Sequence, residues 1–200
     1  MALTEKQFQD AASTLGVTTA HIKAFVAVEA SGNGFLQDGR PKILFERHVF
    51  YRLLKSKRGE AFANEISANN SDICSPSTGG YATGPNSDAR GVAEHKRLAR
   101  ATAIDRECGL QAASWGAGQV MGENWKRCGY VSLQAFVNAA YKEQGQLDMI
   151  VGYLKSDPKI IKAMLDKNWD KVAELYNGRN YAANNYHVKL ANAYTENGGK

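Results

Sequence analysis

Cysteine is scarce in this chain, and the few cysteines are scattered. Cys74, Cys108 and Cys128 are the three among 200 residues, and no two of them form a CxxC pair. Such an odd, dispersed set argues against a disulfide framework or a structural zinc site, so we expect isolated buried thiols in a chain made in a reducing compartment. The four histidines lack the spacing of a HExxH motif, and we therefore expect neither a metal nor another cofactor.

Long hydrophobic runs are also missing. The first residues, MALTEKQFQDAASTLG, are polar and amphipathic, without the apolar core of a secretion signal. No window elsewhere is long and apolar enough to span a membrane. We therefore expect synthesis in the cytoplasm without a signal peptide, and no stable insertion into a membrane.

The charge is not strongly of one sign. The 25 basic and 20 acidic residues give a net charge of +5, a mild excess that suits nucleic acid, an anionic cell surface or a wall polymer without selecting one. A basic cluster at 52–58 is more typical of a solvated helix end, where positive charge favours the helix dipole, than of a nucleic-acid interface. We expect no nucleic-acid binding.

Helical periodicity dominates the rest of the chain. Thr4 and Gln7 form a capping-box pattern that starts a first helix, and Asp157 before Pro158 starts a later one. The other predicted helices are 18–29, 43–57 (whose first turn could be extended), 59–68, 87–107, 132–144, 146–155, 168–177 and 184–195. Three segments are irregular: 31–41, 69–86 and 114–125. With 44% hydrophobic residues, the chain is predicted to be one all-α domain, or an α domain with a minimal β element.

Glu29 stands on the apolar face of its predicted helix. Ile22, Phe25, Val26 and Glu29 follow each other at i, i+3, i+4 and i+7, which is a single face. Burial and the negative end of the helix dipole both disfavour the charged carboxylate, so both raise its pKa. An acid that is protonated near neutral pH can donate a proton to a leaving oxygen. A lone glutamate at a helix end is, however, more often solvated or ion-paired.

Glu46 is a second acid among apolar residues. In a helix it would share a face with Val49 and Phe50, and in an extended segment it would still follow Leu44 on one side. Glycoside hydrolysis commonly uses two carboxylates across a cleft, and the Gly- and Asn-rich segment 31–41 leaves room for a substrate between the two acids. Nearby basic residues could instead pair with these acids, so the residues alone leave both interpretations open.

Four motifs together indicate a family. EASGNGF at 29–35, ILFERH at 43–48, SWGAGQVMG at 114–122 and YNG at 176–178 resemble the phage endolysins of the N-acetylmuramidase family, in the same order over nearly the whole chain. The wider likeness is to the lysozyme-like superfamily, whose members share a helical fold with a catalytic Glu at a helix end. The resemblance implies a lysozyme-like helical domain with a central cleft between two lobes.

The same resemblance implies hydrolysis of the β-1,4 bond between N-acetylmuramic acid and N-acetylglucosamine in peptidoglycan. It implies Glu29 as general acid and Glu46 as the second carboxylate. The substrate-binding residues that we infer are Ser31, Gln119, Asn177 and Tyr181. The Gln119 side chain offers a donor and an acceptor suited to an N-acetyl group, whereas Asn177 before Gly178 is also an ordinary helix end. 

Several alternatives stay open at this point. Trp115 or Trp125 could face a sugar, although core packing is the more frequent role of tryptophan. Inverting, retaining and lytic transglycosylase reactions are all compatible with the residues, because the sequence does not give the separation of the two carboxyls. A non-catalytic peptidoglycan-binding protein on the same fold is a further rival, against which the presence of both acids argues.

The resemblance also bears on domain organisation. Members of the family often carry a wall-binding domain ahead of the catalytic part, and here only two predicted helices reach up to Glu29. We therefore expect a single catalytic domain over 1–200, without a separate wall-binding module, that acts as a monomer on peptidoglycan. We expect it to reach the cell wall from the host cytoplasm after the membrane is permeabilised.

Overall fold

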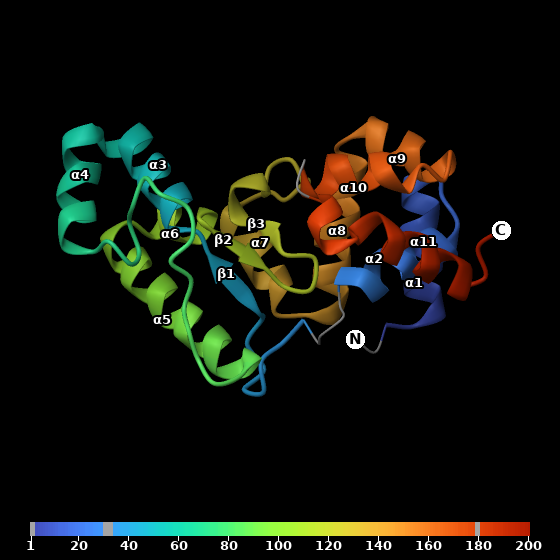
Figure 1. Ribbon diagram of the computed structural model, residues 1–200, viewed down its shortest axis with the longest axis horizontal. Coiled ribbons are helices and arrows are strands. Elements are labelled where there is room, and N and C mark those ends of the chain that lie inside the picture. Colours follow the sequence, from blue (N-terminus) through green and yellow to red (C-terminus); the bar gives the residue numbers. More distant parts are fainter. Residues whose placement is uncertain (1–2, 30–33, 179–180) are drawn as a thin grey trace.

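The computed structural model describes residues 3–29, 34–178 and 181–200. In these parts of the chain, helices gather at the two ends of an elongated molecule and a small sheet lies between them (Figure 1). The α-helices are α1 (Glu5–Leu15), α2 (Thr19–Glu29), α3 (Arg47–Arg58), α4 (Glu60–Asn69), α5 (Ser87–Ile104), α6 (Arg106–Gln111), α7 (Leu133–Ala140), α8 (Glu143–Lys155), α9 (Pro158–Leu165), α10 (Trp169–Asn177) and α11 (Tyr186–Glu196). The strands are β1 (Ile43–Phe45), β2 (Ala113–Trp115) and β3 (Val120–Met121), with 3-10 turns η1 (Gly122–Asn124) and η2 (Tyr181–Asn184).

Most helix boundaries follow local signals in the sequence. Thr4 and Gln7 form the predicted capping box of α1, and the Asp157 side chain caps α9 ahead of Pro158. The prediction of one helix over 87–107 is wrong at its end. Asp105 has an extended backbone, and its side chain accepts from the Cys108 amide, so α5 stops and α6 begins.

The sheet resolves the ambiguity at 43–57. Residues 43–45 are extended and form β1, which pairs antiparallel with β2 in the register Ile43 to Trp115. β2 and β3 form a hairpin from the segment that was predicted to be irregular. Gly116 takes a positive φ of 71° in its turn, a conformation that suits glycine. The predicted helical fold with a minimal β element is therefore confirmed.

Apolar side chains form two main clusters that correspond to two lobes. One cluster, around Phe45 and Phe50, packs β1 and β2 against α3 to α7. The other, around Phe25 and Ile150, packs α1 and α2 against α8 to α11. Helix α8 serves both lobes, because Met149 belongs to the first cluster and Ile150 to the second, and it lies at the centre of Figure 1.

Several residues left open by the sequence lie in the core. Trp115 is 2% exposed and donates its indole N–H to the Leu110 carbonyl at 3.1 Å, so it packs inside rather than facing a ligand. The three cysteines are free and buried, as predicted. Among the described helices, none alone is long and apolar enough to cross a membrane, and only α1 and α2 taken together, bent by 109°, meet that length and composition.

A buried amide side chain joins the parts of the fold. Gln146, on α8, is 1% exposed. Its Oε1 accepts from the Ala117 amide at 2.8 Å, and its Nε2 donates to the carbonyls of Gly34 at 3.2 Å and Ala140 at 2.8 Å. A side chain at Gly34 would clash with Gln146, and a Cβ on Gly116 would lie 2.8 Å from it. Both glycines are therefore needed for the backbone to approach this amide.

Replacing Gln146 by Leu should lower the free energy of unfolding by about 3 kcal/mol, because the buried Ala117 amide and Ala140 carbonyl lose this partner and the Gly34 carbonyl keeps only the Lys42 amide. Urea denaturation followed by circular dichroism measures the change. The matched control is Gln144→Leu on the same helix, whose amide bonds Asp148 at the surface and whose loss should cost about 0.5 kcal/mol or less. Equal effects of the two substitutions would contradict the role of Gln146.

Candidate active site

Glu29 ends α2 on the face that the sequence predicts. Ile22, Phe25 and Val26, on the same face, are buried in the core. The carboxyl of Glu29 is partly buried, and the hydroxyl of Tyr186 on α11 donates a hydrogen bond to its Oε1. Burial raises the pKa of Glu29 to about 7, and the Tyr186 hydrogen bond lowers the pKa by a smaller amount. Glu29 is therefore an acid that is largely protonated at slightly acidic pH.

A row of aromatic rings begins at the Tyr186 ring beside this carboxyl. Tyr186 stacks on Tyr176 of α10 with a centroid distance of 6.2 Å and an interplanar angle of 6°. Tyr176 in turn meets the edge of Phe25 at 5.3 Å and donates its hydroxyl to the carbonyl of Gly118 at 3.2 Å. Because Gly118 belongs to the β2–β3 turn, the rings connect Glu29 with the hairpin. The desolvation that raises the pKa of Glu29 also raises the pKa of both tyrosines.

A pocket of about 240 Å³ lies beside Tyr186, the partner of this acid. It is lined by Asn177, Tyr181, Asn184 and Tyr186. Two predicted substrate residues, Asn177 and Tyr181, are thus brought together next to the tyrosine that contacts Glu29. The Asn177 side chain also hydrogen-bonds Tyr186, and the Tyr181 hydroxyl donates to Asp170 at 3.2 Å.

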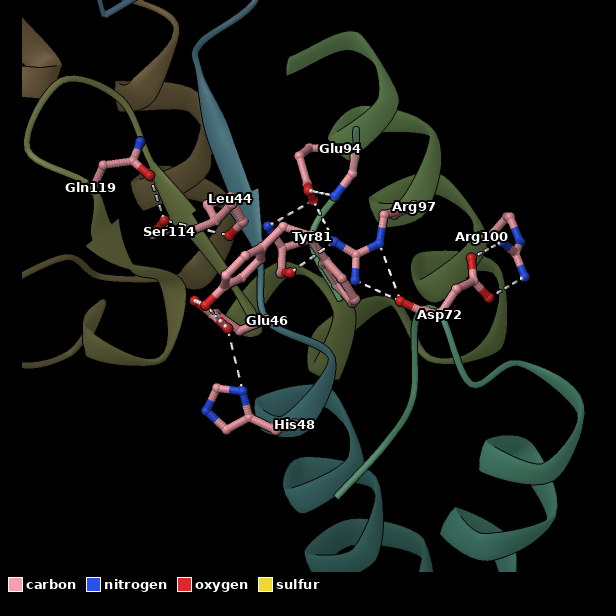
Figure 2. Close-up of polar contacts among 12 residues, drawn as sticks. Leu44, Glu46, His48, Asp72, Tyr81, Glu94, Arg97, Arg100, Ser114 and Gln119 are labelled. Atoms are coloured by element: carbon pink, nitrogen blue, oxygen red, sulfur yellow. Dashed lines mark hydrogen bonds and ion pairs between the residues drawn. The ribbon is translucent and has the colours of Figure 1, made fainter. Parts of the chain in front are cut away.

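Glu46 lies at the start of α3, directly after β1. Its amide donates to the Ala112 carbonyl at 2.9 Å, which fixes its backbone beside the sheet. The Tyr81 hydroxyl lies 3.2 and 3.3 Å from the two carboxylate oxygens, and His48 Nδ1 lies 3.3 Å from Oε2 (Figure 2). The side chain of Glu46 is 15% exposed, so this second acid keeps access to solvent between two polar partners.

A buried ion pair fixes the segment before Glu46. Glu94 and Arg97, one turn apart on α5, are 3% and 7% exposed and pair at 2.7 Å (Figure 2). Glu94 accepts from the amides of Phe45 at 3.1 Å and Ala82 at 2.6 Å. Arg97 donates to the carbonyls of Phe45 at 3.1 Å and Asp72 at 2.5 Å. The pair therefore ties the end of β1 to the loop that precedes α5.

That loop, residues 70–86, supplies Tyr81 to Glu46. Arg47 holds it in place by donating to three of its backbone carbonyls, each at 3.1 Å, which belong to Ser71, Ser77 and Thr78. An irregular loop without strand or helix partners gains a fixed conformation from such side-chain bonds. The position of Tyr81 against Glu46 therefore depends on two arginines, Arg47 and Arg97.

Gln119 lies at the tip of the β2–β3 hairpin and is exposed. The Ser114 hydroxyl donates to its Oε1 at 2.8 Å (Figure 2). Its Nε2 donates to the Gly116 carbonyl at 2.8 Å. Its backbone has a left-handed φ of 44°, which is uncommon for a residue with a side chain. Gln119 also lines a second pocket, of about 300 Å³, together with Tyr81. The structure therefore places it near the partner of Glu46.

The candidate residues thus fall into two groups connected by the hairpin. Glu29 is grouped with Asn177 and Tyr181 on the helical lobe, and Glu46 is grouped with Gln119 on the sheet side. Ser31, the remaining predicted residue, lies outside the described residues. Among the side chains that the structure describes, no three His, Cys, Asp or Glu residues gather as they would around a metal ion.

Sequence reasoning missed the partners of both acids. Tyr186 is 157 positions from Glu29, and Tyr81 is 35 positions from Glu46. Neither tyrosine stands in a motif or a periodic pattern that would connect it to an acid. Glu94 and Arg97 did carry a signal, an opposite-charge pair at i and i+3, but such a pair is ordinarily solvated.

Comparisons with known proteins agree on one family. A family model described as Muramidase: N-acetylmuramidase matches residues 18–197. Among solved structures, one described as the crystal structure of Burkholderia AP3 phage endolysin matches with a TM-score of 0.87 and 41% sequence identity, over 98% of this chain and 71% of that chain. The comparison with curated proteins found no significant match.

Replacing Arg97 by Met should lower the free energy of unfolding by about 3–5 kcal/mol, because Glu94 would remain buried without its counter-ion. Urea denaturation near neutral pH measures this change. Arg100→Met is the matched control on the same helix, since the Arg100–Asp72 pair is half exposed and contributes about 1 kcal/mol or less. A loss for Arg97→Met as small as that of the control would contradict a buried, structure-determining pair.

Replacing Glu29 by Gln should change how stability depends on pH. The folded-state pKa of Glu29 is about 7, above the ordinary value of 4.5. A carboxyl whose pKa is raised in the folded state contributes its full stabilisation below its ordinary pKa, and this contribution is lost as pH rises through about 7. The Gln variant lacks that loss, so its stability relative to the native protein should rise by up to about 3 kcal/mol between about pH 4 and pH 8. Urea denaturation at a series of pH values measures the difference, and a constant difference would contradict the raised pKa.

Proposed function

The chain belongs to the N-acetylmuramidase family, and we propose that Glu29 is the acid with which it protonates the glycosidic bond of peptidoglycan. The protein is a glycoside hydrolase that acts on the bacterial cell wall and cleaves the β-1,4 bond between N-acetylmuramic acid and N-acetylglucosamine. The match over residues 18–197 supports one catalytic domain that includes both lobes.

One observation carries the assignment of Glu29. Its carboxyl lies at a helix end against Tyr186, and burial raises its pKa to about 7. A glutamic acid with an ordinary pKa would be ionised near neutral pH and could not donate a proton, whereas Glu29 keeps a large protonated fraction. Tyr186 holds the Oε1 atom, which leaves the other carboxyl oxygen to approach the substrate.

Glu46 serves in this proposal as the base that activates water. Tyr81 and His48 orient its carboxylate, and its partial exposure admits a water molecule. Glu46 takes a proton from this water while the water oxygen bonds to the anomeric carbon of the muramic acid sugar. The carbon–oxygen bond to the leaving sugar breaks, and its oxygen takes the proton of Glu29. This sequence inverts the anomeric carbon.

The remaining predicted residues are proposed substrate contacts. The pocket lined by Asn177 and Tyr181 is also lined by Tyr186, which contacts the acid, and it offers amide and phenol groups for sugar hydroxyls. Gln119 is exposed at the hairpin, and its amide keeps a second N–H free for an N-acetyl carbonyl. Ser31, two residues after Glu29 in the sequence, is proposed on the family resemblance alone. Action as a monomer and synthesis in the cytoplasm stay predictions.

Replacing Glu29 or Glu46 by Gln should lower the rate of peptidoglycan hydrolysis about 10²–10⁴-fold each, the usual contribution of a general acid or base. The loss of turbidity of permeabilised cells and the release of reducing ends measure the rate. Glu65→Gln is the matched control, because Glu65 is exposed on α4, in the lobe away from Glu29. Undiminished lysis by Glu29→Gln would overturn the assignment of the acid.

The anomeric form of the products tests the role of Glu46 as the base. Nuclear magnetic resonance of the first products should show the α-anomer at a reducing muramic acid end. Initial formation of the β-anomer would contradict Glu46 as the base, and anhydromuramic ends would indicate a transglycosylase instead. Reducing glucosamine ends would place the cleavage at the other glycosidic bond.

A further inference from the structure

A pocket near Glu46 is lined by positively charged side chains that have no role in the proposed reaction. This pocket, of about 300 Å³, is bounded by the start of β1, the loop before α5 and the first turns of α5. Tyr81 lines it and also contacts the Glu46 carboxylate, so the pocket begins one side chain away from the second acid. A ligand in it would therefore lie beside the sugar at the reaction centre.

Two cations line this pocket without a counter-ion. Lys42 and Arg90 belong to its lining, and neither takes part in an ion pair within the described parts of the chain. The acid that also lines it, Glu94, is already paired with Arg97 and accepts two backbone amides. The pocket thus presents two unneutralised positive charges and no free carboxylate on Glu94.

The backbone around both cations is fixed. The Lys42 amide donates to the Gly34 carbonyl at 2.9 Å, and the Lys42 carbonyl accepts from Gly116 at 2.8 Å. Arg90 belongs to the first turns of α5, where its amide bonds the Asn86 carbonyl at 3.1 Å. Two positions on rigid elements can hold charges for a ligand with less ordering cost than two positions on loose loops.

We propose that this pocket binds a carboxylate of the substituent that muramic acid carries on its 3-oxygen. The inference rests on the proposed function, since it names the part of peptidoglycan that this side of the site recognises. Muramic acid differs from glucosamine by a lactyl group at that oxygen, which ends in a carboxylate or continues into a peptide with further carboxylates. Lys42 and Arg90 can therefore distinguish a muramic acid residue, and its peptide, from a neutral sugar.

Binding measurements with three soluble glycans test the proposal. The first glycan carries its peptides, the second has lost them to an amidase and ends in the lactyl carboxylate, and the third carries peptides whose carboxylates have been converted to neutral amides. Dissociation constants are measured by calorimetry in proteins that carry Glu29→Gln, so that the glycans are not consumed. The test variant adds K42Q and R90Q to this background.

The matched control adds K96Q and K159Q, which remove the same two charges from exposed positions outside the pocket. The test variant should bind the peptide-bearing glycan, the amidase-treated glycan or both about threefold to thirtyfold more weakly than its parent does. The increase in the dissociation constant should be at least threefold smaller on the third glycan, whose carboxylates are neutral amides. The dissociation constants of the control variant should stay within about twofold of those of its parent on all three glycans.

The amidase-treated glycan identifies the carboxylate. The lactyl carboxylate is free only in the amidase-treated glycan, so a loss of affinity on that glycan alone assigns the pocket to the lactyl carboxylate. A loss on the peptide-bearing glycan alone assigns the pocket to a carboxylate of the peptide, and a loss on both shows that the pocket accepts either carboxylate. Equal losses on all three glycans, or a control variant that loses as much as the test variant, would overturn the proposal. Lysis by Glu29→Gln itself would instead count against the proposed general acid, so the two failures are distinguishable.

Discussion

The hydrogen bonds of Gln146 constrain the positions of both acids. Its amide holds the carbonyl of Gly34, the amide of Ala117 and the carbonyl of Ala140. Gly34 lies in the chain between the two glutamates, and Ala117 lies in the hairpin whose first strand pairs with β1. A single buried side chain on the central helix therefore joins the segment after Glu29 to the sheet before Glu46. A polar group this deeply buried is tolerated because every hydrogen-bonding atom that it offers has a partner.

The two acids differ because their surroundings differ. Glu29 is largely buried against Tyr186, which stacks on Tyr176, and the loss of water raises its pKa to about 7. The Glu46 side chain stays partly exposed to solvent and lies between the phenol of Tyr81 and the imidazole of His48. Enzymes that need one proton donor and one ionised carboxylate obtain them by placing two chemically similar acids in unlike environments. The two lobes provide these environments, one from stacked aromatic helices and the other from a strand end with a polar loop.

The loop of residues 70–86 shows how an irregular segment becomes part of a site. Arg47 and Arg97 bind its carbonyls, and Glu94 binds one of its amides. Buried ion pairs are poor sources of net stability, since each charge loses its hydration. Their contribution here is positional, because the same Glu94 and Arg97 also bind the backbone of Phe45, the last residue of β1. The loop and the strand that carries Glu46 thus share one anchor.

The helices, their caps and the apolar face that carries Glu29 were determined by the sequence, because these features depend on residues within one or two turns of each other. Glu29 was predictable for that reason, and so was the irregular character of 69–86. The extended start at 43–45 was decided by the tertiary structure, since β1 exists only through pairing with β2, some 70 positions away. The contacts of Tyr186 with Glu29, of Tyr81 with Glu46 and of Gln146 with three separate segments were decided in the same way. Local periodicity carries no information about which distant side chain will meet a given acid, and only the packing of the two lobes brings these partners within hydrogen-bonding distance.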